Sequence, residues 1–598
     1  MQVIATAGHV DHGKSALLRA LTGMEPDRWA EEQRRGMTID LGYVWMDLPS
    51  GERLAFVDVP GHARFVPNML AGVGPVPAVL FVVAADGGWM PQSAEHLAAI
   101  DALGISHGLL AVTRADLADP APALAQARKM IGATSLSDVA AVAVSAMTGL
   151  GLAELRTALD RLARRLPRPD PAAPVRIWVD RAFSITGAGT VLTGTLPAGT
   201  VRRGDELLLT PRLRPVRVRG LQSLGDDADQ VAGVARVALN VRGTDAGDAG
   251  RGMALIRPGQ WTLTNVIDAR LTGVAPAETA PAEIALPRLV TLHLGSARTR
   301  TRVRMLGHDL VRLTLGEKLP LHVGERVLLR DPGAAPDSSG LIGAIVLDVA
   351  PPPIDGRGAA VAAARQLSAW PGRPGASELL SRHKLMRTAD LAAMGLKDVP
   401  PPVAPGWVAD PAYLAGLKAA IRDLVSAHSA SDPLAAGMPL DAARAALGLP
   451  DREIVRAILA DSMLVKDGLI VPAAGCGPAP AALPGPLAGP VATVLADLAE
   501  HPFSAPEAGR LAELGLDARA LAAAARHGAL LRIADQLVLA PGADVAAGQV
   551  LAALPQPFTA AQARAALGTT RRTLIPLLEY LDRRRITRRL PDDRREVR

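Results

Sequence analysis

The sequence predicts a multidomain chain with an α/β nucleotide-binding domain, two β-barrel domains and tandem winged-helix (α+β) modules. Three observations predict this architecture. A G-x-x-x-x-G-K-S motif near the N-terminus stands between an apolar run and a helical run. Short strands separated by Gly and Pro turns dominate 169–352. Beyond 353, a pattern of helix, Gly turn, helix and apolar hairpin recurs four times. The length of 598 residues is ample for these domains.

The phosphate-binding loop lies after an expected buried strand at 3–7 and before an expected helix at 16–21. Its glycines let backbone N–H groups point at phosphate oxygens, and the helix adds its positive N-terminal end. Lys14 can reach the β- and γ-phosphates, and Ser15 can ligate Mg²⁺. We therefore expect a nucleoside triphosphate and Mg²⁺ to bind at Gly8, His9, Val10, Asp11, His12, Gly13, Lys14 and Ser15.

The remainder of 1–168 alternates apolar strands with helical stretches, which predicts a parallel sheet with crossover helices. Strands are expected at 54–57, 78–84, 108–113 and 139–144. Asp58 follows the first of these strands and can hold Mg²⁺ through water, while the N–H of Gly61 can bind the γ-phosphate. Thr38 lies in a polar connection from which it can close over Mg²⁺. Ser15, Thr38 and Asp58 are thus the expected metal side of the site.

Two further segments, Thr113-Arg114-Ala115-Asp116 and Ser145-Ala146-Met147, complete a set of five motifs. In this order they resemble the nucleotide motifs of the translational GTPases. The resemblance implies that the domain is a P-loop GTPase that binds GTP and GDP. It also implies that Asp116 recognises guanine, with Thr113, Arg114, Ser145 and Ala146 beside it.

The same resemblance places His62 where the family orients the attacking water, and it matches Val10 and Met37 to the flanking hydrophobic gate. For His62 by itself, the alternative is an ordinary surface histidine. Arg114 stands where the family usually has a lysine packed over the base, and the stem and planar head of arginine can take that place.

The proline-rich stretch 166–171 is a stiff linker, and strands dominate beyond it. We expect two barrel domains, at 169–259 and 260–352. The segment 183–194 resembles the signature of the second domain of elongation factor Tu and its relatives, and 319–331 resembles the third domain. In that family these domains hold the aminoacyl end and the acceptor arm of a transfer RNA.

Three local stretches, 58–70, 85–93 and 180–183, resemble the family of bacterial selenocysteine-specific elongation factors. The resemblance implies that Asp180, Arg181 and Arg236 line an aminoacyl pocket. A selenol is more acidic than a thiol, whose usual pKa is about 8.5, so selenocysteine is anionic at neutral pH and arginines favour it over serine. The alternative is a surface Asp–Arg pair beside an ordinary strand arginine.

The repeats beyond 353 predict four winged-helix modules, at 353–432, 433–476, 483–542 and 543–598. Residues 551–598 hold 11 Arg and 5 Asp or Glu, which equals the whole net charge of +6. An anionic partner is therefore expected at the last module. The candidate RNA-binding residues are Arg571, Arg572, Arg583, Arg584, Arg585, Arg588 and Arg589.

A solvated basic face is the alternative for these arginines. Aromatic residues are sparse beyond 353, which argues against a platform for stacking single-stranded bases and favours recognition of a hairpin by shape and phosphates. In the resembling family, the last module holds a messenger-RNA hairpin beside a recoded UGA codon.

The sequence thus predicts a translational GTPase that delivers selenocysteyl-tRNA to the ribosome at UGA while bound to an mRNA hairpin. The alternatives are a general elongation- or initiation-type GTPase with another tRNA, and a GTP-switched DNA-binding regulator. One cysteine, no signal-peptide pattern and no long uncharged apolar stretch lead us to expect a cytoplasmic monomer that meets no membrane.

Overall fold

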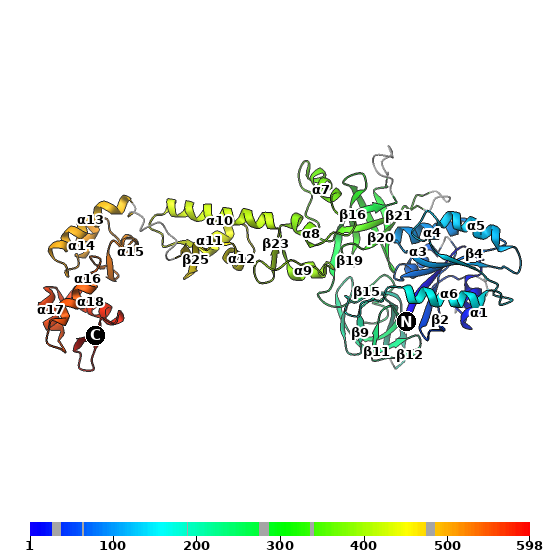
Figure 1. The fold of residues 1–598 in the computed structure, drawn as a ribbon, viewed down its shortest axis with the longest axis horizontal. Coiled ribbons are helices and arrows are strands. Elements are labelled where there is room, and N and C mark those ends of the chain that lie inside the picture. The colour runs from blue at the N-terminus through cyan, green and yellow to red at the C-terminus, as the bar shows by residue number, and fades with distance from the viewer. Residues whose placement is uncertain are drawn as a thin grey trace. The chain divides into compact units, whose positions relative to one another are not determined.

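A computed structural model of the chain describes residues 1–26, 38–62, 65–187, 189–273, 286–334, 340–473, 483 and 485–598. The chain divides into two compact units, Met1–Pro402 and Val403–Arg598 (Figure 1). Met37, Cys476 and the expected end of the second winged-helix module at 476 lie outside the described residues. Within the described ranges, no helix combines the length and apolar character needed to cross a bilayer.

The first domain is a six-stranded sheet with helices on both faces, as predicted. The strand order is β2-β3-β1-β4-β5-β6, and only the edge strand β2 runs antiparallel to its neighbour. One apolar core includes α1 and α6, and another includes α3, α4 and α5, on opposite faces of the sheet (Figure 1). The elements are β1 (Gln2–Ala7), α1 (Lys14–Thr22), β2 (Gly42–Asp47), β3 (Arg53–Asp58), α3 (Val66–Val73), β4 (Ala78–Ala84), α4 (Pro91–Leu103), β5 (His107–Thr113), α5 (Pro120–Ile131), β6 (Ala140–Ala143) and α6 (Leu152–Arg165).

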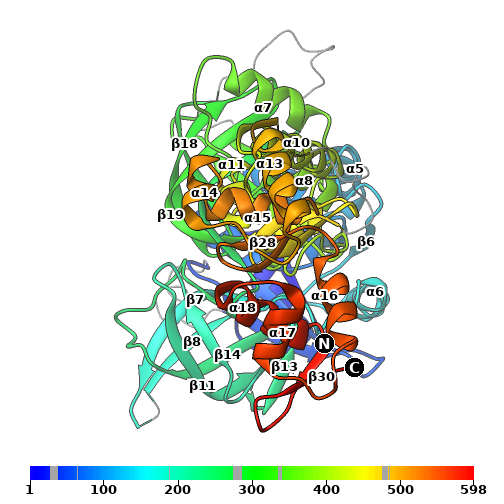
Figure 2. The same cartoon turned by 90° about the vertical axis from the view of Figure 1, so that its left-hand side faces the viewer.

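The second domain is a barrel whose ring runs β10-β15-β7-β8-β14-β11 and closes by pairing of β10 with β11. Figure 2 shows β7, β8, β14 and β11 side by side. Inward residues of β14 alternate with partly exposed ones, which is the period-two pattern of a barrel wall. Its strands are β7 (Arg176–Ile185), β8 (Gly189–Leu196), β9 (Thr200–Arg202), β10 (Glu206–Leu209), β11 (Arg214–Ser223), β12 (Asp226–Asp227), β13 (Gln230–Ala232), β14 (Ala235–Arg242) and β15 (Ala254–Ile256).

The third domain is a closed six-stranded barrel in the order β16-β19-β18-β17-β20-β21. The two barrels confirm the predicted fold class for this part of the chain. The strands are β16 (Thr262–Thr272), β17 (Leu289–Leu294), β18 (Ala297–Met305), β19 (Leu310–Leu321), β20 (Arg326–Arg330) and β21 (Leu341–Asp348).

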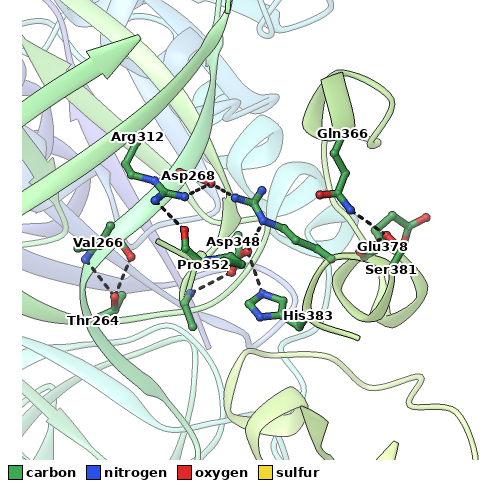
Figure 3. A network of polar contacts seen from close by, with 12 residues as sticks. Thr264, Val266, Asp268, Arg312, Asp348, Pro352, Gln366, Glu378, Ser381 and His383 are labelled. Atoms are coloured by element: carbon green, nitrogen blue, oxygen red, sulfur yellow. Dashed lines mark hydrogen bonds and ion pairs between the residues drawn. The ribbon is translucent and has the colours of Figure 1, made fainter. Parts of the chain in front are cut away.

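A buried ionic network fastens the segment after the third domain to its barrel (Figure 3). The carboxylates of Asp268 in β16 and Asp348 in β21 are fully buried. Arg312 donates to both oxygens of Asp268, at 2.7 and 2.9 Å. Arg382, from α8 (Ala376–His383), donates to Asp268 and lies 3.5 Å from Asp348, and His383 Nε2 is 3.0 Å from Asp348. The helix α8 is therefore part of the first unit.

The expected first winged-helix module at 353–432 spans the division between the two compact units. After α9 (Thr388–Ala393) and the turn at Gly395, the described stretch 396–406 contains no second helix. The long helix α10 (Pro411–Ser431) packs on elements of the following module, and the division between the two units falls before it, at 402/403. The division between the two units at 402/403 thus falls before the predicted boundary at 432/433. The remaining elements here are α7 (Ala359–Ser368), β22 (Leu385–Arg387) and β23 (Trp407–Ala409).

The second module has α10 as its first helix and ends in a hairpin. Its helix–Gly turn–helix pair flanks Gly448, which has a φ of +63°. That left-handed conformation suits glycine and ends the first helix of the pair. The elements after α10 are β24 (Met438–Pro439), α11 (Leu440–Ala446), α12 (Arg452–Ile458), β25 (Met463–Lys466) and β26 (Leu469–Pro472).

The third and fourth modules share one hydrophobic core, which extends from Leu487 to Leu581. The expected helix–Gly turn–helix around Gly568 is present, and α18 continues through Pro576. Leu574, Leu577, Leu578 and Leu581 of α18 are buried, as their spacing predicts. The elements are α13 (Gly485–Glu500), α14 (Ala508–Glu513), α15 (Ala518–Arg526), β27 (Leu531–Ala534), β28 (Leu537–Leu539), α16 (Ala543–Ala552), α17 (Ala560–Leu567), α18 (Arg571–Arg583), β29 (Thr587–Arg589) and β30 (Arg595–Val597).

Candidate nucleotide and aminoacyl sites

The phosphate-binding loop joins β1 to α1 with the curvature that its glycines allow. Gly8 has a φ of +127°, and a Cβ there would lie 2.1 Å from the carbonyl oxygen of Val82, so no larger residue fits. Lys14 is only 6% exposed. Its Nζ donates to the carbonyl oxygens of Gly8 and His9, at 3.1 and 2.8 Å. The ammonium group of Lys14 is thus held within the phosphate-binding loop.

The expected metal side of the site is assembled. Ser15 Oγ donates to Asp58 Oδ2 at 2.7 Å and lies 3.0 Å from Thr38 Oγ1. The other oxygen of Asp58 accepts from Thr6 Oγ1 at 2.7 Å, which fixes the buried carboxylate. Two hydroxyls and one carboxylate form a hard-oxygen set that suits Mg²⁺, which usually takes few carboxylates together with phosphates and water. Thr6 was not predicted.

The Gly61 loop lies directly against the phosphate-binding loop. A Cβ at Gly61 would be 2.5 Å from Lys14 Nζ and 2.5 Å from the amide nitrogen of Val10. This close approach requires glycine and brings the next residue, the partly buried His62, to the phosphate side of the domain. The ring of His62 lies 6.0 Å from that of Phe65.

The two loops expected at the guanine base are adjacent. The N–H of Ala115 donates to the carbonyl oxygen of Val144 at 3.1 Å, so the loop with exposed Asp116 meets the loop of Ser145 and Ala146. Ser145 is fully buried, and its Oγ accepts from the N–H of Thr148 at 3.1 Å. An ordered second loop therefore supports the loop of Asp116.

Thr113 and Arg114 tie the base side to the phosphate side. Thr113 Oγ1 donates to the carbonyl oxygen of His12 at 2.7 Å. Arg114 pairs with Asp86 at 2.9 Å and also donates to the carbonyl oxygen of Asp11. The guanidinium of Arg114 thus holds the phosphate-binding loop as well as bordering the expected base site.

Helix α4 supports the phosphate-binding loop through two residues that sequence reasoning missed. His96 Nδ1 accepts from the N–H of Gly8 at 3.1 Å, and Gln92 Oε1 accepts from the N–H of Val10 at 3.3 Å. Burial, with Lys14 nearby, lowers the pKa of His96 to about 3. Burial likewise lowers the pKa of His12 to about 4. Both imidazoles are neutral at pH 7, which lets His96 act as an acceptor.

Asp180, Arg181 and Arg236 come together on the second domain, at its contact with β2. Arg236 donates to both carboxylate oxygens of Asp180, and Thr193 Oγ1 donates to Asp180 at 2.7 Å. The guanidinium carbon of Arg236 lies 3.8 Å from the ring centre of Tyr43, whose hydroxyl also donates to Asp180 at 3.3 Å. Tyr43 was not predicted, because its place depends on how two domains meet.

In this cluster Arg236 stays cationic and the phenol of Tyr43 stays neutral. Burial by itself would lower the pKa of the Arg236 guanidinium, but Asp180 raises that pKa above its usual value. Burial also raises the pKa of the Tyr43 hydroxyl, so the phenol stays neutral. Arg181 is a quarter exposed, lies 3.4 Å from Asp40, and donates to the backbone carbonyl of Leu41. The arrangement suits a small anion delivered to the edge of the cluster.

A cleft of about 700 Å³ opens beside this pocket, where all three domains of the first unit contribute to its walls. Basic side chains predominate among its charged residues. Asn68 of α3 and the carboxylates of Asp248 and Glu317 also line the cleft. A polyanion that follows the wall would meet Arg212, Arg214, Arg251 and Arg298.

The candidate RNA-binding arginines all lie in the last module, but their environments differ. Arg571 and Arg572 begin α18 and are exposed. Arg572 donates to the carbonyl oxygens of Ala505 and Pro506, at 3.2 and 2.6 Å, so it also fastens α18 to the third module.

The other five candidates are exposed around the wing, and four of them have partners within the chain. Arg585 has a φ of +60° at the end of α18. The partners are Ile533 O for Arg583, Asp544 for Arg584, Glu596 for Arg588 and Asp593 for Arg589.

The chain is similar to several known proteins. Residues 1–165 match the family model of the elongation factor Tu GTP binding domain, and 549–595 match the model described as elongation factor SelB, winged helix. Elongation factor Tu 2 of Streptomyces avermitilis is 31% identical over 293 residues, which cover 45% of this chain and 75% of that protein. The chain belongs to the translational GTPases of the elongation factor Tu type.

The chain is also similar to selenocysteine-specific elongation factors. The factor of that description from Escherichia coli K12 is 37% identical over 353 residues, covering 58% of this chain and 56% of that protein. The chain thus spans about half the length of the curated relatives of this type that it matches. A crystal structure of a bacterial selenocysteine-specific elongation factor, EF-Sec, aligns over 100% of this chain and 99% of that one, at 25% identity and a TM-score of 0.75.

Proposed function

We propose that this protein is a cytoplasmic, monomeric GTPase that delivers selenocysteyl-tRNA to the ribosome. The observation that carries the substrate assignment is the partly buried cluster of Asp180, Arg181 and Arg236. An ordinary aminoacyl pocket for serine has no need of two arginines, whereas a selenolate needs a cationic partner in a site shielded from water. Two of the relatives named above, the Escherichia coli factor and EF-Sec, are selenocysteine-specific factors, which supports the same assignment.

The nucleotide site would drive the delivery. Bound GTP with Mg²⁺ supplies a hydrolysable phosphoanhydride and a charged γ-phosphate, for which the phosphate-binding loop and the set of Ser15, Thr38 and Asp58 are suited. His62 is the residue we propose to orient the attacking water, because Gly61 holds it against the phosphate-binding loop. Asp116, supported by the Ser145 loop, would accept from the guanine ring N–H and amino group.

The basic cleft beside the pocket is proposed to hold the acceptor end of the tRNA. The exposed start of α18, with Arg571 first, is proposed to hold an mRNA hairpin near the recoded UGA codon. A helix that presents cations at its N-terminus can clamp phosphates. Arg571 supports this role best, because it is exposed and no ion pair of the described chain occupies it.

The deciding experiment compares protection of the aminoacyl ester in selenocysteyl-tRNA and in seryl-tRNA of the same tRNA body, with GTP and with GDP. We expect GTP-dependent protection of the selenocysteyl ester alone. Equal protection of both would move the specificity to the tRNA body, and protection of neither would overturn the delivery role. Ester protection of general elongator tRNAs, measured in the same way, tests the alternative of a general elongation- or initiation-type GTPase. Competition between a DNA duplex and the hairpin RNA tests the alternative of a GTP-switched DNA-binding regulator.

A further inference from the structure

Residues 38–41 connect the metal side of the nucleotide site to the arginines of the aminoacyl pocket. Thr38 Oγ1 lies 3.0 Å from Ser15 Oγ. Two residues further on, Asp40 Oδ1 accepts from Arg251 at 3.1 Å, and its Oδ2 lies 3.4 Å from Arg181. The next carbonyl oxygen, that of Leu41, accepts from Arg181 as well.

Only one residue, Ile39, separates Thr38 from Asp40. The path from Thr38 to Asp40 spans at most about 7 Å when fully extended. The intervening Ile39 is itself held, because its carbonyl oxygen accepts from Asn68 of α3 at 2.8 Å. A displacement of Thr38 large enough to break the hydrogen bond between Ile39 and Asn68 therefore reaches Asp40 through two peptide units.

Asp40 also decides how the charges of the pocket are arranged. The cluster contains two carboxylates, Asp40 and Asp180, and three guanidinium groups, Arg181, Arg236 and Arg251. Asp180 is committed to Arg236 by two hydrogen bonds. The orientation of Arg181 and Arg251 thus depends on Asp40, and one positive charge remains for an incoming anion.

We propose that Asp40 is a positioning residue that couples the nucleotide state to the anion-binding arrangement of Arg181 and Arg251. While Thr38 is held at the phosphate-binding loop, Asp40 holds both arginines and the pocket accepts the selenolate. When Thr38 is released, the two guanidinium groups lose their common partner and the pocket loses affinity. Coupling of this kind is reciprocal, so the charged aminoacyl group also strengthens binding of the triphosphate. The inference rests on the proposed function for the identity of the anion, but not for the coupling.

The first test needs no tRNA. Phenylglyoxal labelling of Arg181 and Arg251, read by peptide mass spectrometry, is compared with GTPγS·Mg²⁺ and with GDP·Mg²⁺ bound. We expect labelling to be slower with GTPγS by about fivefold, at the low end of typical couplings. Asp40→Asn is expected to abolish the difference, and Asp40→Glu, which keeps the charge, to retain much of it. Equal labelling in both nucleotide states of the wild type would overturn the proposal.

A matched control is available in Asp226→Asn. Asp226 on the second domain pairs with Arg53 of the first domain at 3.1 Å, so this variant also removes an ion pair between the same two domains. Arg53 lies at the end of β3 opposite to Asp58, away from the nucleotide site. Labelling of Arg181 in Asp226→Asn should keep its dependence on nucleotide. If Asp226→Asn abolishes the dependence as fully as Asp40→Asn, the coupling is a general property of domain contact and Asp40 has no special role.

The second test measures the ratio of tRNA affinities with GTPγS and GDP for selenocysteyl-tRNA and seryl-tRNA. Asp40→Asn should lower the ratio for selenocysteyl-tRNA about fivefold, within the usual range of coupling. A wild-type ratio in Asp40→Asn would overturn the proposal. If selenocysteyl- and seryl-tRNA behave alike in the wild type, and Asp40→Asn lowers both ratios, the selenocysteine assignment fails while the coupling stands.

Discussion

At the scale of single residues, the nucleotide site depends on side chains that hold other side chains. Thr6 fixes one oxygen of Asp58 while Ser15 takes the other, and His96 holds the backbone of Gly8. Such partners leave the ligand-contacting groups little freedom, which is the condition for a preorganised phosphate site. Substitutions at this site should therefore affect nucleotide affinity, GTP hydrolysis and the stability of the first unit to different extents.

His62→Ala is expected to keep GTP and GDP affinity near that of the wild type and to lose most ribosome-stimulated hydrolysis. General acid–base or water-orienting groups typically contribute about 10²–10⁴-fold, and the loss should fall in that range. Single-turnover hydrolysis with and without ribosomes measures it, and equilibrium nucleotide binding is the control. Hydrolysis at the wild-type rate would return His62 to the reading of a surface histidine.

The stability of the first unit should fall as the pH falls below 6.5. The folded protein holds His96 neutral, with its pKa lowered to about 3, whereas the unfolded chain protonates near the usual value of 6.5. The unfolded state therefore binds more protons between these two values, and folding loses about 1.4 kcal/mol per pH unit there from this one group. At pH 5 the loss is about 2 kcal/mol.

Urea unfolding of the nucleotide-free protein at pH 7 and pH 5 checks this prediction. His96→Gln, which keeps an acceptor for Gly8, should lose most of the contribution of this group. His428→Gln in α10, which belongs to the second unit, is the control variant, and the first unit should keep the pH dependence of the wild type in it. A pH dependence in His96→Gln equal to that of the wild type would contradict the assignment.

At the scale of elements, the start of α18 is the part of the last module that we propose to meet phosphates. Arg571→Ala should weaken hairpin binding for all sequences alike and lower the slope of log affinity against log salt by up to about one unit. Arg594, which pairs with Asp592 at 2.6 Å, supplies the matched control in Arg594→Ala. Filter binding or fluorescence anisotropy across a salt series would give both the hairpin affinity and its salt slope. The same slope in both variants would favour a solvated basic face.

The elements also show where sequence reasoning works and where it fails. The phosphate-binding loop was predictable, because the close approach of Gly8 and the reach of Lys14 are properties of a contiguous motif. The boundary before α10 was not, because an Ala-rich helix carries little periodicity to say which module it packs on. Tyr43, Asp40 and His96 were missed because their partners are far away in the chain, and an isolated sequence does not reveal how distant elements meet.

At the scale of the whole molecule, the chain is organised as two compact units, and each has its own means of stabilisation. The first unit contains three domains and the buried network of Asp268, Asp348, Arg312, Arg382 and His383. Such a network is costly to break once built, because the groups left behind stay buried without a partner.

Arg382→Ala should therefore destabilise the first unit by about 3–5 kcal/mol, the usual result of removing one partner from a buried ionic group. The second unit, Val403–Arg598, should unfold as in the wild type. Urea unfolding followed by limited proteolysis, with fragments assigned by mass, distinguishes the two. Arg357→Ala, outside the network, serves as the control, and equal stability of both variants would show that the network contributes little.

The shared core of the third and fourth modules limits how this protein can be rebuilt or can diverge. A chimaera that exchanges only the segment from α16 onward would replace one part of a packed interior and leave the remainder against side chains to which it is not fitted. A change of RNA specificity by transplantation must therefore move residues 485–598 together. At this end of the chain, the third and fourth modules should therefore be exchanged, in engineering or in evolution, as a pair.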